Sequence, residues 1–219
     1  MPKKPFTDEE VTQQRERIMQ SAAKIMADIG YHHLSMRVLA KELNMAASNI
    51  YNYFADKEQL FLAARQRGFD LLLQTIKKPL SEQLGSYPSL TGFALAVVHF
   101  AQDYAGFYQL MFQPPKIGLE ELNAGQKQVQ QQTERQLDEW QHHVLLLLTD
   151  ALPGLEQASI EKRQQAALYF LSALHGLIDV YHHQSFPALL NNLDLIADSF
   201  VASQLEQILS GLSKVATAA

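Results

Sequence analysis

The sequence of 219 residues contains no cysteine, so it can form neither a disulfide nor a thiolate metal site, and it has no cysteine nucleophile. It also lacks any apolar run near the roughly 18 residues that a membrane-spanning helix requires. The basic start, Met1–Glu10, has no apolar core of the kind a signal peptide contains. We therefore expect a protein without a membrane partner that works in the cytoplasm.

Excess positive charge is also missing, since the net charge is −5, and this argues at first against nucleic-acid binding. The charge is, however, unevenly divided along the chain. Residues 1–68 carry 10 basic and 8 acidic side chains, whereas residues 69–219 carry 8 and 15. A mildly basic first third and an acidic remainder indicate two parts with different tasks.

Helical periodicity dominates the chain, and no alternating pattern long enough for a strand is present. Thr7 and Glu10 have the spacing of a capping box that starts a first helix, and Gly30 can end that helix. Proline and glycine separate the later helical segments, which predicts an all-α fold. These segments lie near residues 90–112, 119–151, 158–184 and 188–211. The glutamine-rich stretch Gln126–Gln136 is interpreted as a solvated helix face.

Two short helices are predicted over Met36–Leu43 and Ala46–Phe54, with Asn44 in the turn and Asp56 capping a fourth helix. Two short helices joined by a tight turn are typical of the helix-turn-helix, whose second helix lies in the DNA major groove. Seven apolar side chains are expected to face inward. They are Leu34, Val38, Leu39, Leu43, Ile50, Tyr51 and Phe54.

The side chains expected to face outward are small, amide or phenolic groups, which carry little charge but many hydrogen-bonding atoms. Asparagine can bond adenine at two points, and an alanine methyl can contact a thymine methyl. Arg37 can reach guanine or a phosphate, and Lys57 at a helix start can hold a phosphate. The candidate DNA-contacting residues are Ser35, Arg37, Ala46, Ala47, Ser48, Asn49, Asn52, Tyr53 and Lys57.

The run Ala47-Ser-Asn-Ile-Tyr-Asn-Tyr-Phe-Ala-Asp-Lys-Glu-Gln-Leu60 resembles the signature of the TetR/AcrR family of transcriptional regulators, as do the upstream Gly30 and Leu34. The resemblance implies a homodimer that binds a palindromic double-stranded DNA operator, more commonly as a repressor. It also implies a variable C-terminal domain that binds a small-molecule effector. We accordingly predict a helix-turn-helix DNA-binding domain over residues 1–56 and a larger helical effector-binding and dimerisation domain over residues 57–219.

Two residues depart from the family pattern. Asn44 stands where a glycine is usual in the turn, and asparagine tolerates the left-handed conformation, so we expect the turn to survive. Ala46 stands where a serine or threonine usually caps the recognition helix, and loss of such a cap costs about 0.5–2 kcal/mol. DNA phosphates could bind the N–H groups that this alanine leaves exposed.

The C-terminal part combines many aromatic residues with a few polar groups, which is the composition of a ligand pocket. His99 with Asp103, and His175 with Asp179, are four residues apart and so share a helix face. The alternative is that the aromatic rings form an ordinary bundle core. The candidate ligand-binding residues are His99, Asp103, Tyr104, Phe107, Met111, Trp140, His143, Phe170 and His175.

Residues 158–184 carry an apolar stripe, and the stripe over residues 188–211 is too wide for one internal contact. The family resemblance implies that these two helices pair with the same helices of a second subunit. The fourth helix, about residues 57–76, is the expected transmitter between the two parts. Gly68 lies within it and either permits bending or makes room for a close neighbour.

No cofactor or metal is expected, because histidines occur as adjacent pairs and no His-x-x-x-His spacing is present. No sequence motif for a phosphate loop, a nucleophile elbow or a dinucleotide site is present either, so an enzyme is not predicted. Two alternatives stay open at this point. One is a DNA-binding organiser without an effector, and the other is a helical enzyme that uses a His–Asp pair.

Overall fold

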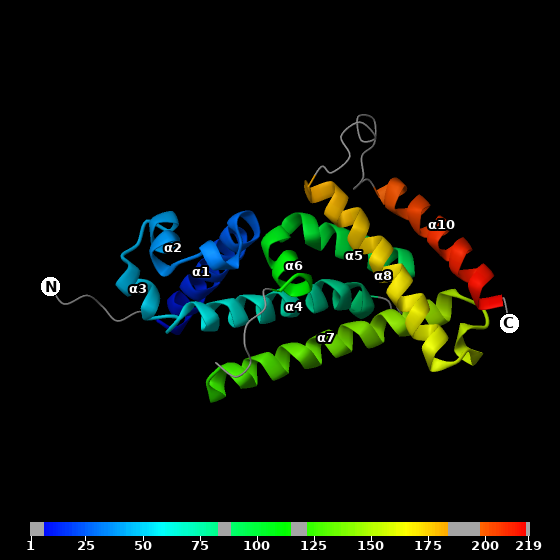
Figure 1. The fold of residues 1–219 in the computed structure, drawn as a ribbon, viewed down its shortest axis with the longest axis horizontal. Coiled ribbons are helices and arrows are strands. Elements are labelled where there is room, and N and C mark those ends of the chain that lie inside the picture. Colours follow the sequence, from blue (N-terminus) through cyan, green and yellow to red (C-terminus); the bar gives the residue numbers. More distant parts are fainter. Residues whose placement is uncertain (1–6, 83–88, 115–121, 184–197, 218–219) are drawn as a thin grey trace. The chain divides into compact units, whose positions relative to one another are not determined.

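The computed structural model describes residues 7–82, 89–114, 122–183 and 198–217. These residues form helices and no strand, which confirms the all-α prediction (Figure 1). The α-helices are α1 (Asp8–Ile29), α2 (Met36–Glu42), α3 (Ala47–Tyr51), α4 (Lys57–Glu82), α5 (Leu90–Asp103), α6 (Ala105–Phe112), α7 (Ala124–Ala151), α8 (Ile160–His183) and α10 (Asp198–Thr217). Single 3-10 turns occur at η1 (Tyr31–His33) and η3 (Leu155–Gln157). Among the helices described here, none has the length and apolar character needed to cross a bilayer.

The chain divides into two compact units. Unit 1 comprises residues 1–71 and 104–136, and unit 2 comprises residues 72–103 and 137–219. Helices α4 and α7 therefore contribute residues to both units. The functional boundary after residue 56 stays a prediction, because compactness alone does not say which residues contact DNA. The predicted helix starts near residues 119 and 188 lie outside the described residues.

The predicted limits of the first helix are confirmed. The Thr7 hydroxyl accepts a hydrogen bond from the Glu10 N–H at 3.2 Å, and the Thr7 N–H donates to the Glu10 carboxylate at 2.8 Å. Gly30 ends α1 with a φ of 86°, a conformation that favours glycine. Between these caps, α1 buries one apolar face that includes Ile18 and Ala22, both 0% exposed.

Helices α2 and α3 form the predicted helix-turn-helix in unit 1. Asn44 has a φ of 53° and is the one non-glycine residue with positive φ in the part of the chain the structure describes. The turn closes with a hydrogen bond from the Met45 N–H to the Ala40 carbonyl at 2.8 Å. The core beneath it contains Leu39, Ile50 and Phe54, each 0% exposed.

Three predictions about these short helices are wrong in detail. Helix α3 ends at Tyr51, three residues before the predicted end at Phe54. Val38 and Tyr51, predicted to face inward, are 41% and 53% exposed. A short helix presents only one narrow face to the core, and each of these residues is turned about 100° from a neighbour, Leu39 or Ile50, that fills it.

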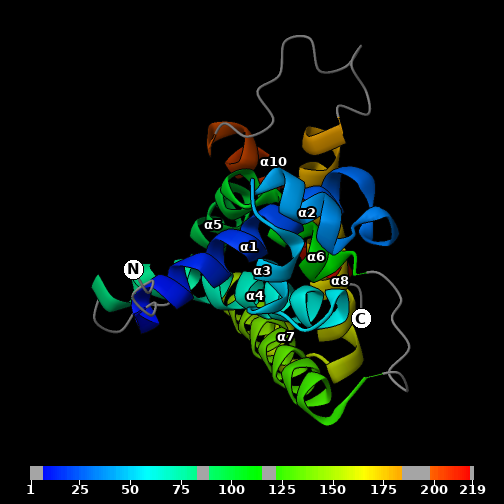
Figure 2. The ribbon, with the colours of Figure 1, turned by 90° about the vertical axis from the view of Figure 1, so that its left-hand side faces the viewer.

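The segment predicted as one helix over residues 90–112 is broken in two at Tyr104. The break sets the direction of α6, which lies beside α1 in both views (Figures 1 and 2). Gly106 makes the close approach possible, because a Cβ atom there would lie 2.6 Å from the carbonyl carbon of Ala23. Likewise, a Cβ atom on Gly68 would lie 2.6 Å from the Met111 sulfur, which supports the close-neighbour interpretation of that glycine.

Candidate nucleic-acid interface and ligand pocket

The predicted DNA-contacting residues gather on α2, α3 and the start of α4. Ser35 has a structural task, since its hydroxyl caps α2 by accepting a hydrogen bond from the Val38 N–H at 3.2 Å. Ala46 provides no such cap for α3, as predicted. The exposed members of the set are Ser35, Arg37, Ala46, Ser48, Asn49 and Asn52, and the half-buried ones are Ala47, Tyr53 and Lys57.

The outward side chains of this set are available to a partner. Across the described residues, the side chains of Arg37, Ser48, Asn49 and Asn52 make no hydrogen bond. Solvated guanidinium, hydroxyl and amide groups on one short helix pair are the donors and acceptors that base edges and phosphates need. Their contact with particular bases stays a prediction.

Helix α1 holds the helix-turn-helix in place through two arginines that sequence reasoning missed. Arg15 donates a hydrogen bond to the Tyr53 carbonyl, and its guanidinium carbon lies 4.3 Å from the centre of the Phe54 ring. Arg17 donates to the Leu43 carbonyl at 3.3 Å, next to the turn. On the sequence alone these cations look like a solvated face of α1, because their carbonyl acceptors lie 26 or more residues away.

Lys57 is positioned rather than free. Its ammonium lies 4.2 Å from the centre of the Tyr31 ring and donates to the Tyr31 carbonyl at 3.4 Å. This arrangement fixes the cation at the start of α4 while leaving two ammonium hydrogens for a phosphate. Asp56 caps the helix as predicted, accepting from the Gln59 N–H at 2.6 Å, and the Gln59 amide oxygen accepts from the Ala55 N–H at 2.7 Å.

Gln126 joins the first turns of two helices, and we call this arrangement the shared cap. Its amide nitrogen donates to both carboxylate oxygens of Asp56, at 3.0 and 3.1 Å. Its amide oxygen accepts from the Asn123 N–H at 2.9 Å, while the Asn123 side chain accepts from the Gln126 N–H at 3.0 Å. Gln126 thus completes the capping box of α7 and binds the N-cap of α4.

The interpretation of Gln126–Gln136 as a solvated face holds for most of the stretch, where Gln128, Gln131 and Gln132 are exposed, and fails at a few positions. Gln126 is only 6% exposed and Thr133 is fully buried, while Gln136 donates a hydrogen bond to Asp70. The sequence holds one signal for this, the Asn123-x-x-Gln126 spacing of a capping box. The partner Asp56 lies 70 residues away and has no local signature.

The nine predicted ligand-binding residues are divided between the two compact units. Tyr104, Phe107 and Met111 belong to unit 1, and the other six belong to unit 2. Phe107 and Met111 are buried at 2% and 1% exposure and pack on Gly68. These two side chains therefore fill space in unit 1, and a ligand role for them stays a prediction.

Within unit 2, the predicted rings pack on one another. Phe93 lies 6.2 Å from Trp140, 6.4 Å from Phe170 and 6.1 Å from His143, measured between ring centres. His175 adds a further ring 6.2 Å from Trp140. Trp140 and Phe170 are 2% and 0% exposed, so this arrangement favours the alternative of an ordinary bundle core.

The His–Asp pairs expected from spacing have other partners. His99 lies 2.9 Å from Asp198 on α10, and both side chains are largely exposed, whereas Asp179 lies 3.4 Å from His183. Burial lowers the pKa of His175 to about 4, so its ring is neutral at pH 7. Within the described ranges, no group of three His, Asp or Glu side chains has the arrangement of a metal site.

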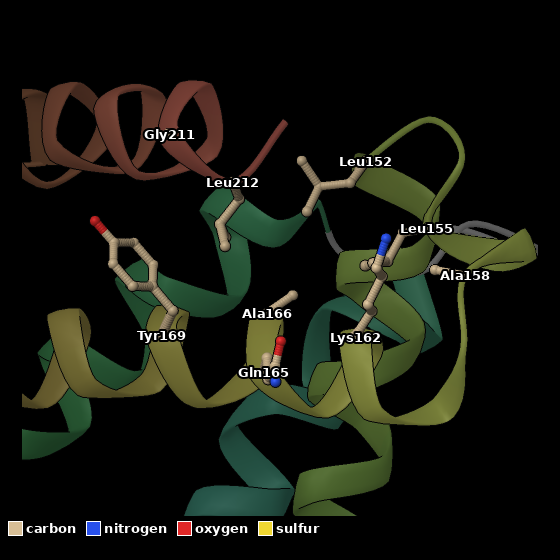
Figure 3. A pocket seen from close by; sticks show the side chains of 9 residues that line it. All are labelled: Leu152, Leu155, Ala158, Lys162, Gln165, Ala166, Tyr169, Gly211 and Leu212. Carbon is tan, nitrogen blue, oxygen red and sulfur yellow. The ribbon is translucent and has the colours of Figure 1, made fainter. Parts of the chain in front are cut away.

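A pocket of about 270 Å³ lies elsewhere in unit 2, and we call it the α8–α10 pocket. The end of α7, the η3 turn, the first turns of α8 and the end of α10 surround it (Figure 3). None of the nine predicted ligand residues lines it. A second, much smaller pocket between α5 and α8 has no space for a water-sized molecule.

Comparison with known families gives two matches along the chain. Residues 18–64 match the model for bacterial regulatory proteins of the tetR family. Residues 90–204 match the model for a tetracyclin repressor-like C-terminal domain. The two matches together cover the helix-turn-helix and most of unit 2.

Individual relatives match mainly at the N-terminal end. An uncharacterized HTH-type transcriptional regulator from Haemophilus influenzae is 39% identical over 67 residues, which is 31% of this chain and 36% of the relative. The HTH-type transcriptional activator FasR from Mycolicibacterium smegmatis is 25% identical over 46% of each chain. The matched region thus spans between about a third and a half of these curated relatives.

A solved structure shares the fold over nearly the whole length. The transcriptional regulator FadR from Bacillus subtilis, solved in complex with stearoyl-CoA, aligns with 90% of this chain and 98% of its own. The TM-score is 0.62 at 17% identity. This likeness confirms an all-helical arrangement with an N-terminal helix-turn-helix and a larger C-terminal part.

Proposed function

The chain belongs to the TetR family of bacterial regulatory proteins, and we propose that it is a sequence-specific DNA-binding transcriptional regulator. One observation carries the proposal. Arginines of α1 hold the helix-turn-helix in place, while the outward side chains of α2 and α3 make no hydrogen bond within the described residues. The family is one of regulators rather than of enzymes, so no catalytic role is proposed. The protein would act in the cytoplasm, where bacterial DNA lies.

In the proposed complex, α3 enters the major groove. Asn49 and Asn52 are exposed amides that can read adenine, and each good two-point contact is worth about 1–3 kcal/mol of base discrimination. Arg37 contacts guanine or a phosphate and Lys57 contacts a phosphate, and these contacts set the register of the helix on the duplex. The remaining predicted contacts, including Ala46, Ala47 and Tyr53, shape the surface between these polar groups.

We propose a homodimer formed through α8 and α10. Helix α8 exposes large apolar side chains, with Ile160, Leu168 and Tyr169 at 69%, 68% and 55% exposure. Gly176 on the same helix has open space around it, which would let a partner helix approach closely. The two α3 helices of the dimer would then lie about 34–36 Å apart, or a multiple of that distance, on a palindromic operator. A monomer in light scattering at micromolar concentration would contradict this part.

We further propose that a small-molecule effector changes operator affinity. FadR in complex with stearoyl-CoA supports this, because it shows that the shared fold can hold a small molecule. An effector acts only if it binds the two conformations with different affinity. Repression is the proposed sign of regulation. Since FasR is named an activator, a reporter gene with and without the protein decides the sign.

Selection of bound DNA from a random pool tests the central proposal. The full-length protein should enrich a palindrome with half-sites about one helical turn apart. The double variant Asn49→Ala, Asn52→Ala should lose affinity and relax base preference, whereas Lys127→Gln, an exposed change on α7, should do neither. If the double variant kept both affinity and sequence preference, the assigned base contacts would be wrong.

A further inference from the structure

The α8–α10 pocket has the features of a binding site that differs from the aromatic cluster. We propose that it binds a small organic monoanion with an apolar body, such as an alkyl or aryl carboxylate. The inference rests on the proposed function, because it names the chemical class of the effector and the place where it binds.

The walls of the pocket are apolar and rigid. Leu152, Leu155, Ala166 and Leu212 are 3%, 2%, 7% and 6% exposed, so they are fixed in the core of unit 2 while they border the space. Figure 3 shows Leu212 and Ala166 pointing into this space from α10 and α8. Such walls favour an apolar ligand body, and the volume of about 270 Å³ is slightly below that of pockets for drug-sized ligands, roughly 300–1,000 Å³.

The rim of the pocket supplies three polar side chains. Lys162, Gln165 and Tyr169 are exposed on one face of α8 and line the pocket. In the described part of the chain, the side chains of these three residues make no hydrogen bond or ion pair. A largely apolar cavity with a small number of convergent polar groups is the general pattern of ligand sites.

The charge of the rim selects the sign of the ligand. Among the described residues that line the pocket, Lys162 is the one charged side chain and none is acidic. A carboxylate at the Lys162 end of the pocket could accept a charge-assisted hydrogen bond from the Lys162 ammonium, while an ammonium ligand would face a like charge. The site therefore fits an anion rather than a cation or a neutral molecule.

Gly211 keeps the pocket open. The nearest atom to a Cβ placed there is the Tyr169 hydroxyl oxygen at 4.0 Å, so alanine would fit, but a longer side chain would extend into the space. Because α8 and α10 both line the pocket, a bound ligand would fix the spacing of the two helices proposed for dimerisation. This gives the ligand a route to favour one conformation of the dimer.

Calorimetry on the full-length protein with octanoate, octan-1-ol and octylammonium tests the ligand class. Octanoate should bind saturably, and the other two should bind at least about tenfold more weakly, since a charge-assisted hydrogen bond is lost. Lys162→Gln should weaken octanoate binding about tenfold, whereas Lys127→Gln should leave it unchanged. Equal binding of all three probes would overturn the proposal.

A substitution that fills the pocket with a side chain tests where octanoate binds. Gly211→Leu should abolish octanoate binding, and Ser210→Leu, one residue away and exposed, should not. The dimer mass of each variant is measured in parallel. If wild type binds no octanoate and Gly211→Leu separates the subunits, the pocket holds the partner subunit and the inference is wrong. Operator binding without ligand is measured separately. Absence of operator binding would contradict the proposed function, whereas absence of octanoate binding alone would contradict only the inference about the pocket.

Discussion

Each of the two units is stabilised internally by a different kind of contact. In unit 1, directional hydrogen bonds from Arg15, Arg17 and Gln126 fix the ends of helices near the proposed DNA-reading surface. In unit 2, the core is a cluster of rings around Trp140, which is stabilised mainly by the burial of apolar surface. Because a hydrogen bond weakens when its geometry changes, the contacts in unit 1 hold these helix ends in defined positions.

The largest expected effect is on the free energy of unfolding, and it comes from a substitution that prevents the close approach of α1 and α6 in unit 1. Gly106→Ala should reduce the free energy of unfolding by about 3 kcal/mol, because its Cβ would press on the Ala23 backbone, which cannot move aside as a side chain can. Gly125→Ala, whose Cβ would have ordinary contacts, should change stability by less than about 1 kcal/mol. Urea denaturation measures both, and equal stabilities would show that the two helices can separate without cost.

A second prediction concerns pH and the core of unit 2. The pKa of His175 is lowered to about 4 in the folded protein, while the unfolded value is about 6.5, so the unfolded state binds more protons between these values. This contribution to the free energy of unfolding is fully present above pH 6.5 and is lost as pH falls toward 4. At pH 5 the loss amounts to about 2 kcal/mol. Urea denaturation at pH 7 and pH 5 should show this loss in wild type.

Two variants isolate the histidine responsible. His175→Phe should show a smaller loss between pH 7 and pH 5, because no proton is taken up at that position. His99→Asn changes an exposed histidine and should keep the loss seen in wild type. An undiminished loss in His175→Phe would assign the pH dependence to other groups.

Removal of the shared cap should have an intermediate effect in unit 1. Gln126→Ala leaves the Asn123 N–H and the Asp56 carboxylate without this partner, so stability should fall by about 1–2 kcal/mol. Operator affinity should fall as well, since Asp56 caps the helix that begins with Lys57. Gln128→Ala, on an exposed position of α7, is the control in denaturation and in fluorescence anisotropy.

The smallest expected effect concerns electrostatics at the DNA surface. Lys57→Ala should weaken binding uniformly across sequences and reduce the slope of log affinity against log salt by about 1 for each half-site. The fold should be nearly unaffected, because the Tyr31 ring remains packed on Phe61. A change in base preference, measured on single-base operator variants, would mean that Lys57 contacts a base.

Features set by neighbouring residues were predictable from the sequence. Thr7 with Glu10, the end of α1 at Gly30 and the positive φ of Asn44 all follow from local chemistry, and the structure confirms them. The signature from Ala47 to Leu60 likewise indicated the family.

Features that depend on distant partners were not predictable. His99 meets Asp198 across 99 residues, and Gln126 meets Asp56 across 70. The exposure of Tyr51 depends on Ile50 filling the single core-facing position of α3. The α8–α10 pocket is formed by residues 152–169 together with Gly211 and Leu212, and no spacing along the chain shows that these two stretches meet.

The shared cap depends on the identity of a single atom in the Gln126 side chain. The Gln126 amide is held in one orientation, because its oxygen accepts from Asn123 and its nitrogen donates to Asp56. Deamidation would replace that nitrogen with oxygen and leave the shape of the side chain unchanged. The attraction at about 3 Å would become a repulsion between two carboxylates. Replacement of one atom, with no change in volume, would therefore loosen the start of α4 at the DNA-reading surface.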